Sequence, residues 1–206
     1  MNDEKMKSIK DLIVAILLSD CDIKKRSKSE RDIIFTLENS HKQYILENYI
    51  SRNQIDNYID IQRLEDSRFL VKSNLLIEKI LQDWTDEKQR VSYINPQLLN
   101  VNVFILLICL FGQRGKKDVH IKTSMTRGAQ ETVQFFMFEY IGVHFIPSGR
   151  HFKIRLLNKL VEKSIVEGRP AYESVEMASL LTESERKSFL TVREKHKEDQ
   201  YTYAFY

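Results

Sequence analysis

All six glycines of this 206-residue chain lie in one window, between Gly112 and Gly168. Glycine permits sharp turns and positive φ, so a segment that lacks it favours long, regular elements. The same window changes the spacing of the apolar residues. They recur every three or four positions before about residue 117 and every second position after it, which is the step from helix to strand. The sequence therefore predicts a helical frame that holds a turn-rich, β-rich insert.

The helical part is expected over residues 1–112. Apolar spacing predicts one helix over 4–18, a second from Ser29 whose apolar stripe runs from Ile34 to Tyr49, and a third over about 54–84. A fourth helix is bounded by Asn95 and Pro96 at its start and by Gly112 just past its end. These four helices are expected to form an N-terminal bundle.

The β-rich insert is expected over 113–156. Apolar and polar residues alternate around 119–125, 133–137 and 152–156, with turn residues at 126–130 and 147–150. This predicts a small three-stranded antiparallel sheet at about 117–156, with Gly142 as a bulge in its middle strand. Residues 157–206 are expected to form C-terminal helices, one of which starts at the capping box Thr182-x-x-Glu185. The fold class is therefore α+β, in a single domain of residues 1–206.

Positive charge is concentrated in the insert. Between residues 112 and 156 there are eight basic and three acidic side chains, whereas the segments on either side each have one more acidic than basic residue. A local positive potential attracts anionic partners even when the net charge is only +3. We therefore expect an interface for nucleic acid or an acidic protein surface at these residues: Arg114, Lys116, Lys117, Lys122, Arg127, Arg150, Lys153 and Arg155. The alternative is that these side chains are only solvated and that the nearby aromatic residues fill the core.

No targeting or membrane-spanning segment is expected. Asp3, Glu4 and Asp11 place acidic residues where a signal peptide needs basic ones. The longest apolar run, 103–111, has nine residues, about half of what a membrane span requires. Cys21 and Cys109 are too few for a disulfide framework and predict free thiols in a reducing compartment. We expect an intracellular, soluble protein without membrane contact, metal or cofactor.

Two features of the insert bear on catalysis. The segment from Gly112 to Lys117 has only two residues between its glycines, and Asp118 stands where a phosphate loop needs a hydroxyl residue, so nucleotide hydrolysis is not expected. His120 and His151 lie close to basic residues, and such a pair is able to act as general acid and base in phosphodiester cleavage. His120 should point away from the face of Val119 and Ile121, which favours an exposed histidine.

The absence of a strong catalytic motif favours a non-catalytic subunit or adaptor of an intracellular protein assembly, with other proteins as its partners. Its aromatic tail would bind a partner through Tyr201, Tyr203, Phe205 and Tyr206. The second hypothesis is a dedicated nucleic-acid-binding module. The third is a phosphodiester-cleaving enzyme that uses His120 and His151.

Overall fold

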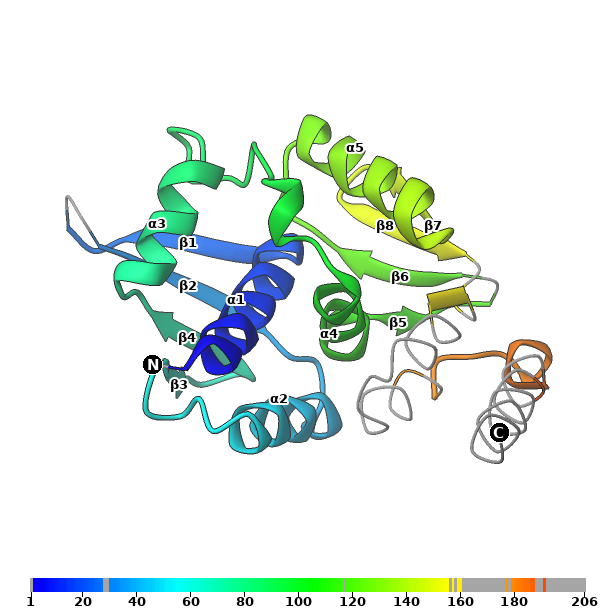
Figure 1. The fold of residues 1–206 in the computed structure, drawn as a ribbon, viewed down its shortest axis with the longest axis horizontal. Coiled ribbons are helices and arrows are strands. Elements are labelled where there is room, and N and C mark those ends of the chain that lie inside the picture. The colour runs from blue at the N-terminus through cyan, green and yellow to red at the C-terminus, as the bar shows by residue number, and fades with distance from the viewer. Residues whose placement is uncertain are drawn as a thin grey trace, which may run out of the picture.

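The computed structural model describes residues 2–27, 30–116, 118–155, 157, 159–160, 177, 179–187 and 191. Within these residues the chain is α+β, as expected, with two four-stranded antiparallel sheets and helices packed on both (Figure 1). No helix in these ranges is both long enough and apolar enough to cross a membrane.

The first half of the chain folds as helix, hairpin, helix, hairpin, helix. Its elements are α1 (Asp3–Leu18), β1 (Cys21–Lys25), β2 (Arg31–Thr36), α2 (Ser40–Arg52), β3 (Asp60–Arg63), β4 (Arg68–Lys72) and α3 (Leu75–Trp84). The strands lie in the order β1-β2-β4-β3 and pair antiparallel throughout.

The second half repeats this order through its second hairpin. After the short 3-10 helix η1 (Pro96–Leu98) come α4 (Val101–Phe111), β5 (Gln113–Arg114), β6 (Val119–Lys122), α5 (Arg127–Phe136), the π-helix η2 (Met137–Ile141), β7 (His144–Ser148) and β8 (His151–Arg155). The strand order β5-β6-β8-β7 is that of the first sheet, shifted by four strands. The fold is therefore an internal duplication of topology, although the sequence shows no repeat.

Helices α1 and α4 begin the two halves and pack against each other between the two sheets (Figure 1). Their apolar residues explain this central position, because Leu12–Leu18 of α1 and Val103–Leu110 of α4 are buried on all sides. Polar side chains also meet at this contact. The buried carboxylate of Asp11 accepts a hydrogen bond of 2.8 Å from Nδ2 of Asn100, whose own Oδ1 caps α4.

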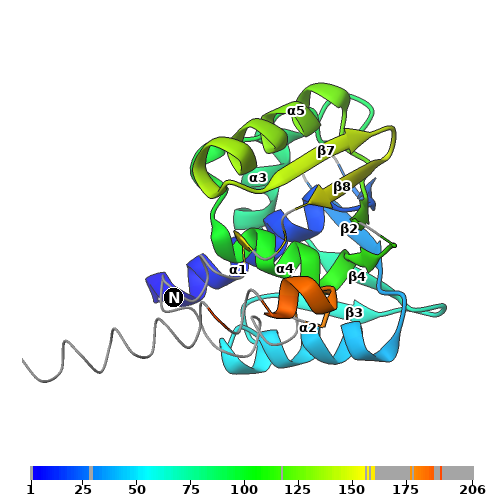
Figure 2. The same cartoon turned by 90° about the vertical axis from the view of Figure 1, so that its right-hand side faces the viewer.

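Each sheet buries one face and exposes the other. In the second sheet Val119, Ile121, Phe152 and Ile154 alternate with polar residues and point into the core, and Figure 2 shows α5 lying along β7 and β8. In the first sheet Ile33, Phe35, Phe69 and Val71 form the buried face. The opposite face of each sheet carries mostly polar and charged side chains.

The expected N-terminal helical bundle is interrupted by strands. The segment that follows Ser29 is β2 up to Thr36, and α2 starts only after the cap Asn39. The residues Ile33 and Phe35 alternate with the half-buried Ile34, so the strand period prevails where a helical stripe was expected. Similarly, the expected helix over 54–84 consists of β3, β4 and α3, because the chain turns between the strands at Asp66 and Ser67, both with positive φ.

The expected middle strand of the insert is a helix. Residues 127–141 form α5 and η2, in which Ala129, Val133 and Met137 are buried at a spacing of four while Phe135 is exposed. Gly142 (φ 75°) terminates this helix in the left-handed conformation, where a bulge was expected. A sheet is present in this segment as expected, but it has four strands. Strands β5 and β7 pair with β6 and β8 at its two edges.

The ends of the apolar helix are partly as expected. Asn95 and Pro96 cap only η1, and Asn100 caps α4 itself, so the helix begins later than the sequence suggested. Gly112 does stand just past its end. The capping box is confirmed as well. Glu185 accepts a hydrogen bond of 2.7 Å from the backbone N–H of Thr182, and Thr182 Oγ1 accepts one of 3.2 Å from that of Glu185.

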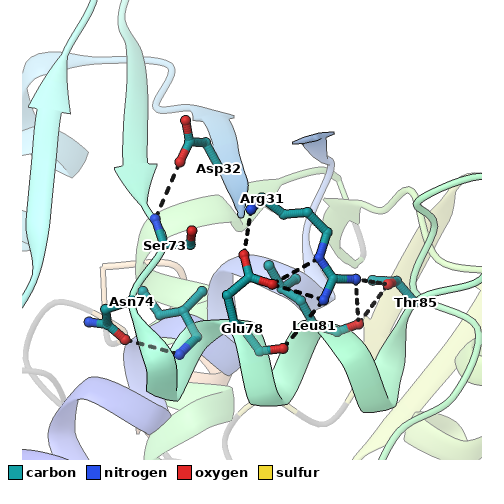
Figure 3. A network of polar contacts seen from close by, with 8 residues as sticks. Arg31, Asp32, Ser73, Asn74, Glu78, Leu81 and Thr85 are labelled. Carbon is teal, nitrogen blue, oxygen red and sulfur yellow. Dashed lines mark hydrogen bonds and ion pairs between the residues drawn. The ribbon is translucent and has the colours of Figure 1, made fainter. Parts of the chain in front are cut away.

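A buried ion pair ties β2 to α3. Arg31 contacts Glu78 at 2.9 Å, and its guanidinium also donates to Thr85 Oγ1 at 3.0 Å (Figure 3). The backbone N–H of Arg31 donates to the same carboxylate. Because both side chains are nearly buried, at 13% and 11% exposure, each charge depends on the other for compensation.

Candidate functional site

A pocket of about 240 Å³ lies at the junction of the two halves, at the C-terminal ends of α1 and α4. Residues from both halves line it: Asp20, Thr36, Glu38, Lys42, Leu110, Phe111, Gln113 and Lys122. The pocket therefore combines the turn after α1, the turn before α2, the turn after α4, and the end of β6.

Asp20 and Gln113 occupy corresponding positions in this pocket. Asp20 is the second residue after α1 and precedes β1, and Gln113 is the second residue after α4, at the start of β5. Asp20 is exposed and makes no hydrogen bond or ion pair with a described side chain, so its carboxylate is available to a ligand. The pocket is symmetric in backbone topology and asymmetric in chemistry, with a carboxylate on one side and an amide on the other.

The second half holds the Asp20 turn in place. Ser124, which follows β6, donates its hydroxyl to the carbonyl of Cys21 at 2.9 Å, and its N–H donates to the carbonyl of Ser19 at 3.3 Å. Burial raises the pKa of the Cys21 thiol to about 12, and the neighbouring Asp20 and Asp22 carboxylates act in the same direction. Cys21 is therefore a neutral core residue under Asp20, without a role as a nucleophile.

Two lysines supply positive charge at the pocket. Lys42 is largely buried and contacts Glu38 at 3.3 Å, which compensates both charges. Lys122 is exposed at the end of β6 and makes no ion pair with a described residue. Asp20 and Lys122 are thus the two charged side chains of the pocket that remain open to a bound group.

The outer face of the second sheet extends from Lys122. The residues that alternate with its buried positions are His120 and Lys122 on β6, His151, Lys153 and Arg155 on β8, and His144, Ile146 and Ser148 on β7. Three fixed cations and three histidines therefore lie on one face. The carboxylate of Asp118 contacts Arg155 at 3.0 Å at the edge of this face.

The structure brings together some of the residues expected to bind an anion. Lys122, Lys153 and Arg155 share the outer face described above, while Lys116 and Arg150 are exposed in the adjacent turns. Lys122, at the pocket, joins this face to Asp20.

Other residues of that expected set lie elsewhere. Arg114 faces the opposite side of β5 and pairs with Glu185 at 3.3 Å. Arg127 begins α5, on the covered side of the sheet, and pairs with Glu131 at 2.9 Å. Lys117 and the tail residues Tyr201, Tyr203, Phe205 and Tyr206 lie outside the described residues.

His120 and His151 share one face, as the alternation of β6 predicted, but they are not directly opposite each other. His120 faces Lys153, and His151 faces Lys122. Neither histidine lines the pocket that contains Asp20. Their use as a catalytic acid–base pair remains a prediction.

The sequence patterns do not predict Asp20 or Gln113 as site residues. Each stands two positions after a helix that ends in a continuous apolar run, and that shared context is the signal present in the sequence. Nothing in the sequence shows that the two helices pack together, so the meeting of these residues required the tertiary structure.

No family model and no curated protein matches this sequence. Solved structures do match. The homing endonuclease I-WcaI bound to its DNA recognition sequence is 13% identical, with a TM-score of 0.55 over 83% of this chain and 86% of that one. A single-substitution variant of the homing endonuclease I-DmoI, in complex with its target DNA and in the presence of Mn, is 16% identical, with a TM-score of 0.50 over 79% of this chain and 96% of that one.

The chain shares the fold of these endonucleases. This finding contradicts the expectation of a non-catalytic adaptor and of a protein without enzymatic activity, because the structures that share the fold are DNA-cleaving enzymes on DNA. The expectation of protein partners has no support from the same comparison. The adaptor hypothesis rested on the lack of a recognisable catalytic motif, whereas the residues that line the pocket come from separate parts of the chain.

Proposed function

We propose that this protein binds duplex DNA and hydrolyses a phosphodiester bond at the pocket between α1 and α4. The observation that carries the proposal is the exposed Asp20 carboxylate in the same pocket as Lys122, at the junction of two halves whose fold matches DNA-bound homing endonucleases. In hydrolysis, water adds to phosphorus and one P–O ester bond breaks, which leaves a phosphate monoester and a hydroxyl.

The residues of the pocket fit a divalent cation held jointly with DNA. The structure of the I-DmoI complex was obtained in the presence of Mn, and Mg²⁺ or Mn²⁺ typically uses one or two protein carboxylates together with substrate phosphate oxygens and water. The described residues hold no cluster of three His, Cys, Asp or Glu side chains, and the one uncompensated carboxylate of the pocket is Asp20. Asp20 would therefore hold the cation, which when bound supplies Lewis-acid polarisation of a phosphate oxygen.

Lys122 would act on the substrate directly. Lys122 lines the pocket and lies on the outer face of the second sheet. Its ammonium group would therefore attract the backbone phosphate and stabilise negative charge that develops during bond cleavage. Lys42 would act indirectly, because its ion pair with Glu38 compensates that carboxylate near an incoming phosphate.

The asymmetry of the pocket suggests cleavage of one strand. The two strands of duplex DNA are related by local two-fold symmetry, and proteins with two-fold architecture commonly match it. The two halves of this chain would then each serve one strand, and only the half with Asp20 carries a carboxylate at the corresponding position. We therefore propose a single hydrolytic centre that nicks the duplex.

The test begins with selection of bound duplexes from a random-sequence library, because the fold does not specify which DNA sequence the protein prefers. The selected duplex, labelled on each strand in turn, is incubated with Mg²⁺ or Mn²⁺. We expect cleavage of one labelled strand and its loss in Asp20→Asn, with DNA affinity retained. If no duplex is enriched, DNA binding is wrong. If Asp20→Asn cleaves as fast as the parent protein, the assignment of Asp20 is wrong.

A direct measurement of the cation separates its binding from catalysis. Titration of Mn²⁺ followed by electron paramagnetic resonance should show binding to the DNA complex of the parent protein and a loss of at least about tenfold in affinity for Asp20→Asn, as expected when a ligating carboxylate is removed. Unchanged Mn²⁺ affinity would show that Asp20 is not the ligand.

A further inference from the structure

The register of the second sheet sets every histidine of its outer face directly opposite a cation. His120 faces Lys153, His151 faces Lys122, and His144 faces Arg155. Side chains directly opposite each other on antiparallel strands have Cβ atoms about 5 Å apart. A single phosphate group is therefore able to contact both members of each pair.

Two of these histidines are held in place by neighbours. The ring of His144 packs edge-on against Phe138 of η2, with ring centroids 5.2 Å apart. The His120 ring lies over the turn between β5 and β6, so close to Gly115 that a Cβ there would approach Nε2 to 2.9 Å. These contacts limit the rotation of both imidazoles while leaving them at the outer face, so less freedom is lost when an anion binds.

The charges around the three histidines are mostly positive. The basic residues on β6 and β8 are Lys122, Lys153 and Arg155. The acidic residue is Asp118, which precedes β6 and contacts Arg155. Lys116 is exposed in the turn before β6, and Gln113 is the neutral neighbour of His120 on β5. From η2 the charged residue is Glu139, and no ion pair joins it to His144 among the described residues.

The outer face of the first sheet lacks this bias. At the positions that alternate with its buried residues, Lys24, Arg68 and Lys72 are balanced by Asp22, Asp32 and Asp60. Lys72 contacts Asp60 at 3.1 Å. A polyanion would therefore find its main electrostatic attraction on the second sheet.

We infer that the outer face of β6, β8 and β7 binds backbone phosphates through three histidine–cation pairs, and that DNA binding takes up protons at His120, His144 and His151. This inference rests on the proposed function for its ligand. A charged imidazole binds phosphate more strongly than a neutral one, and imidazoles ordinarily change charge between pH 5 and 8. By linkage, a bound phosphate favours the protonated ring, so affinity rises as pH falls through this range.

The affinity of a fluorescent duplex of mixed sequence, without divalent cations, is measured at pH 6.0 and pH 8.0 by anisotropy. Each proton taken up changes affinity by up to tenfold per pH unit, so we expect at least about tenfold tighter binding at pH 6.0. The triple variant His120→Gln, His144→Gln, His151→Gln should keep the affinity of pH 8.0 and lose the dependence on pH. His41→Gln, on α2 and away from this face, is the matched control and should behave as the parent protein.

A second readout counts the protons. Calorimetric titration of the same duplex in buffers of different ionisation enthalpy should report net proton uptake at pH 7 by the parent protein and none by the triple variant, with thermal unfolding confirming that the variant is folded. Binding without pH dependence, or pH dependence that persists in the triple variant, would overturn this inference and leave DNA binding intact. Absence of binding at both pH values would overturn the proposed function and this inference together.

Discussion

Asp20 and Gln113 stand at the same place in the two topologically equivalent halves and line the same pocket, one as a carboxylate and the other as an amide. The duplicated fold therefore places two candidate hydrolytic centres in one pocket, and only one of them has a carboxylate. This arrangement separates the geometry of the site, which is shared, from its chemistry, which is not.

Gln113→Asp should convert a nick into cleavage of both strands. The new carboxylate would stand where Asp20 stands in the other half, so the second strand would gain a cation ligand. A supercoiled plasmid that carries the selected sequence should be converted by Gln113→Asp to linear product, where the parent protein produces the open circle. Gln113→Asn, which changes length without adding charge, is the control. Open-circular product alone from Gln113→Asp would contradict the equivalence of the two positions.

Lys122→Met should reduce the rate of cleavage by at least about a hundredfold, because a cation that stabilises developing charge in the pocket is removed. The affinity for DNA should fall by only a few fold, as expected for the loss of one phosphate contact. Single-turnover rates and anisotropy titrations separate the two effects. Lys116→Met, in the exposed turn before β6, should lower affinity slightly and leave the cleavage rate of bound DNA unchanged.

Glu78→Ala should destabilise the protein by about 3 kcal/mol, because it leaves the buried Arg31 guanidinium without its counter-charge. The free energy of unfolding from urea titration measures this loss. Glu30→Ala removes a solvent-exposed ion pair with Arg26 and should cost at most about 1 kcal/mol. Equal losses of unfolding free energy in the two variants would show that burial of the Arg31–Glu78 pair does not affect stability.

Asn100→Ala should destabilise the protein by about 2 kcal/mol. It removes the N-cap of α4, which alone is worth about 1 kcal/mol, and also the hydrogen bond to the buried Asp11 carboxylate. Asn95 caps only the exposed η1, so Asn95→Ala should lose about half as much stability or less. Chemical denaturation of both variants provides the comparison, and a larger loss for Asn95→Ala would contradict the role of Asn100 between the halves.

Cys21 should be inert toward iodoacetamide in the folded protein at pH 8. The thiolate is the reactive form, and burial raises the pKa of this thiol to about 12, so almost none is ionised. Mass spectrometry after a timed reaction should show Cys21 unmodified until urea unfolds the chain. Asp20→Asn should leave this protection in place, since burial is the main cause of the raised pKa. Rapid modification in the native protein would contradict the packing around β1.

The sequence by itself determined the features that depend on neighbouring residues. It placed the first helix, the stop at Gly112, the capping box at Thr182 and the outward direction of His120, because caps and short periods are local signals. It failed where short strands compete with helices. The apolar residues of β2 fit a helical stripe as well as a strand, and only pairing with β1 and β4 selects the strand. In α5 the reverse holds, because burial of Ala129, Val133 and Met137 against the sheet selects the helix.

Only the tertiary structure decided which residues form the site. Asp20 and Gln113 are 93 positions apart in the chain, and each follows a helical stretch, 12–18 or 103–110, that is buried on all sides. The packing of α1 against α4 brings their ends together, and the duplicated strand order makes the two positions equivalent. The sequence supplied the charges and the histidines, whereas the register of β6 and β8 decided that they face one another.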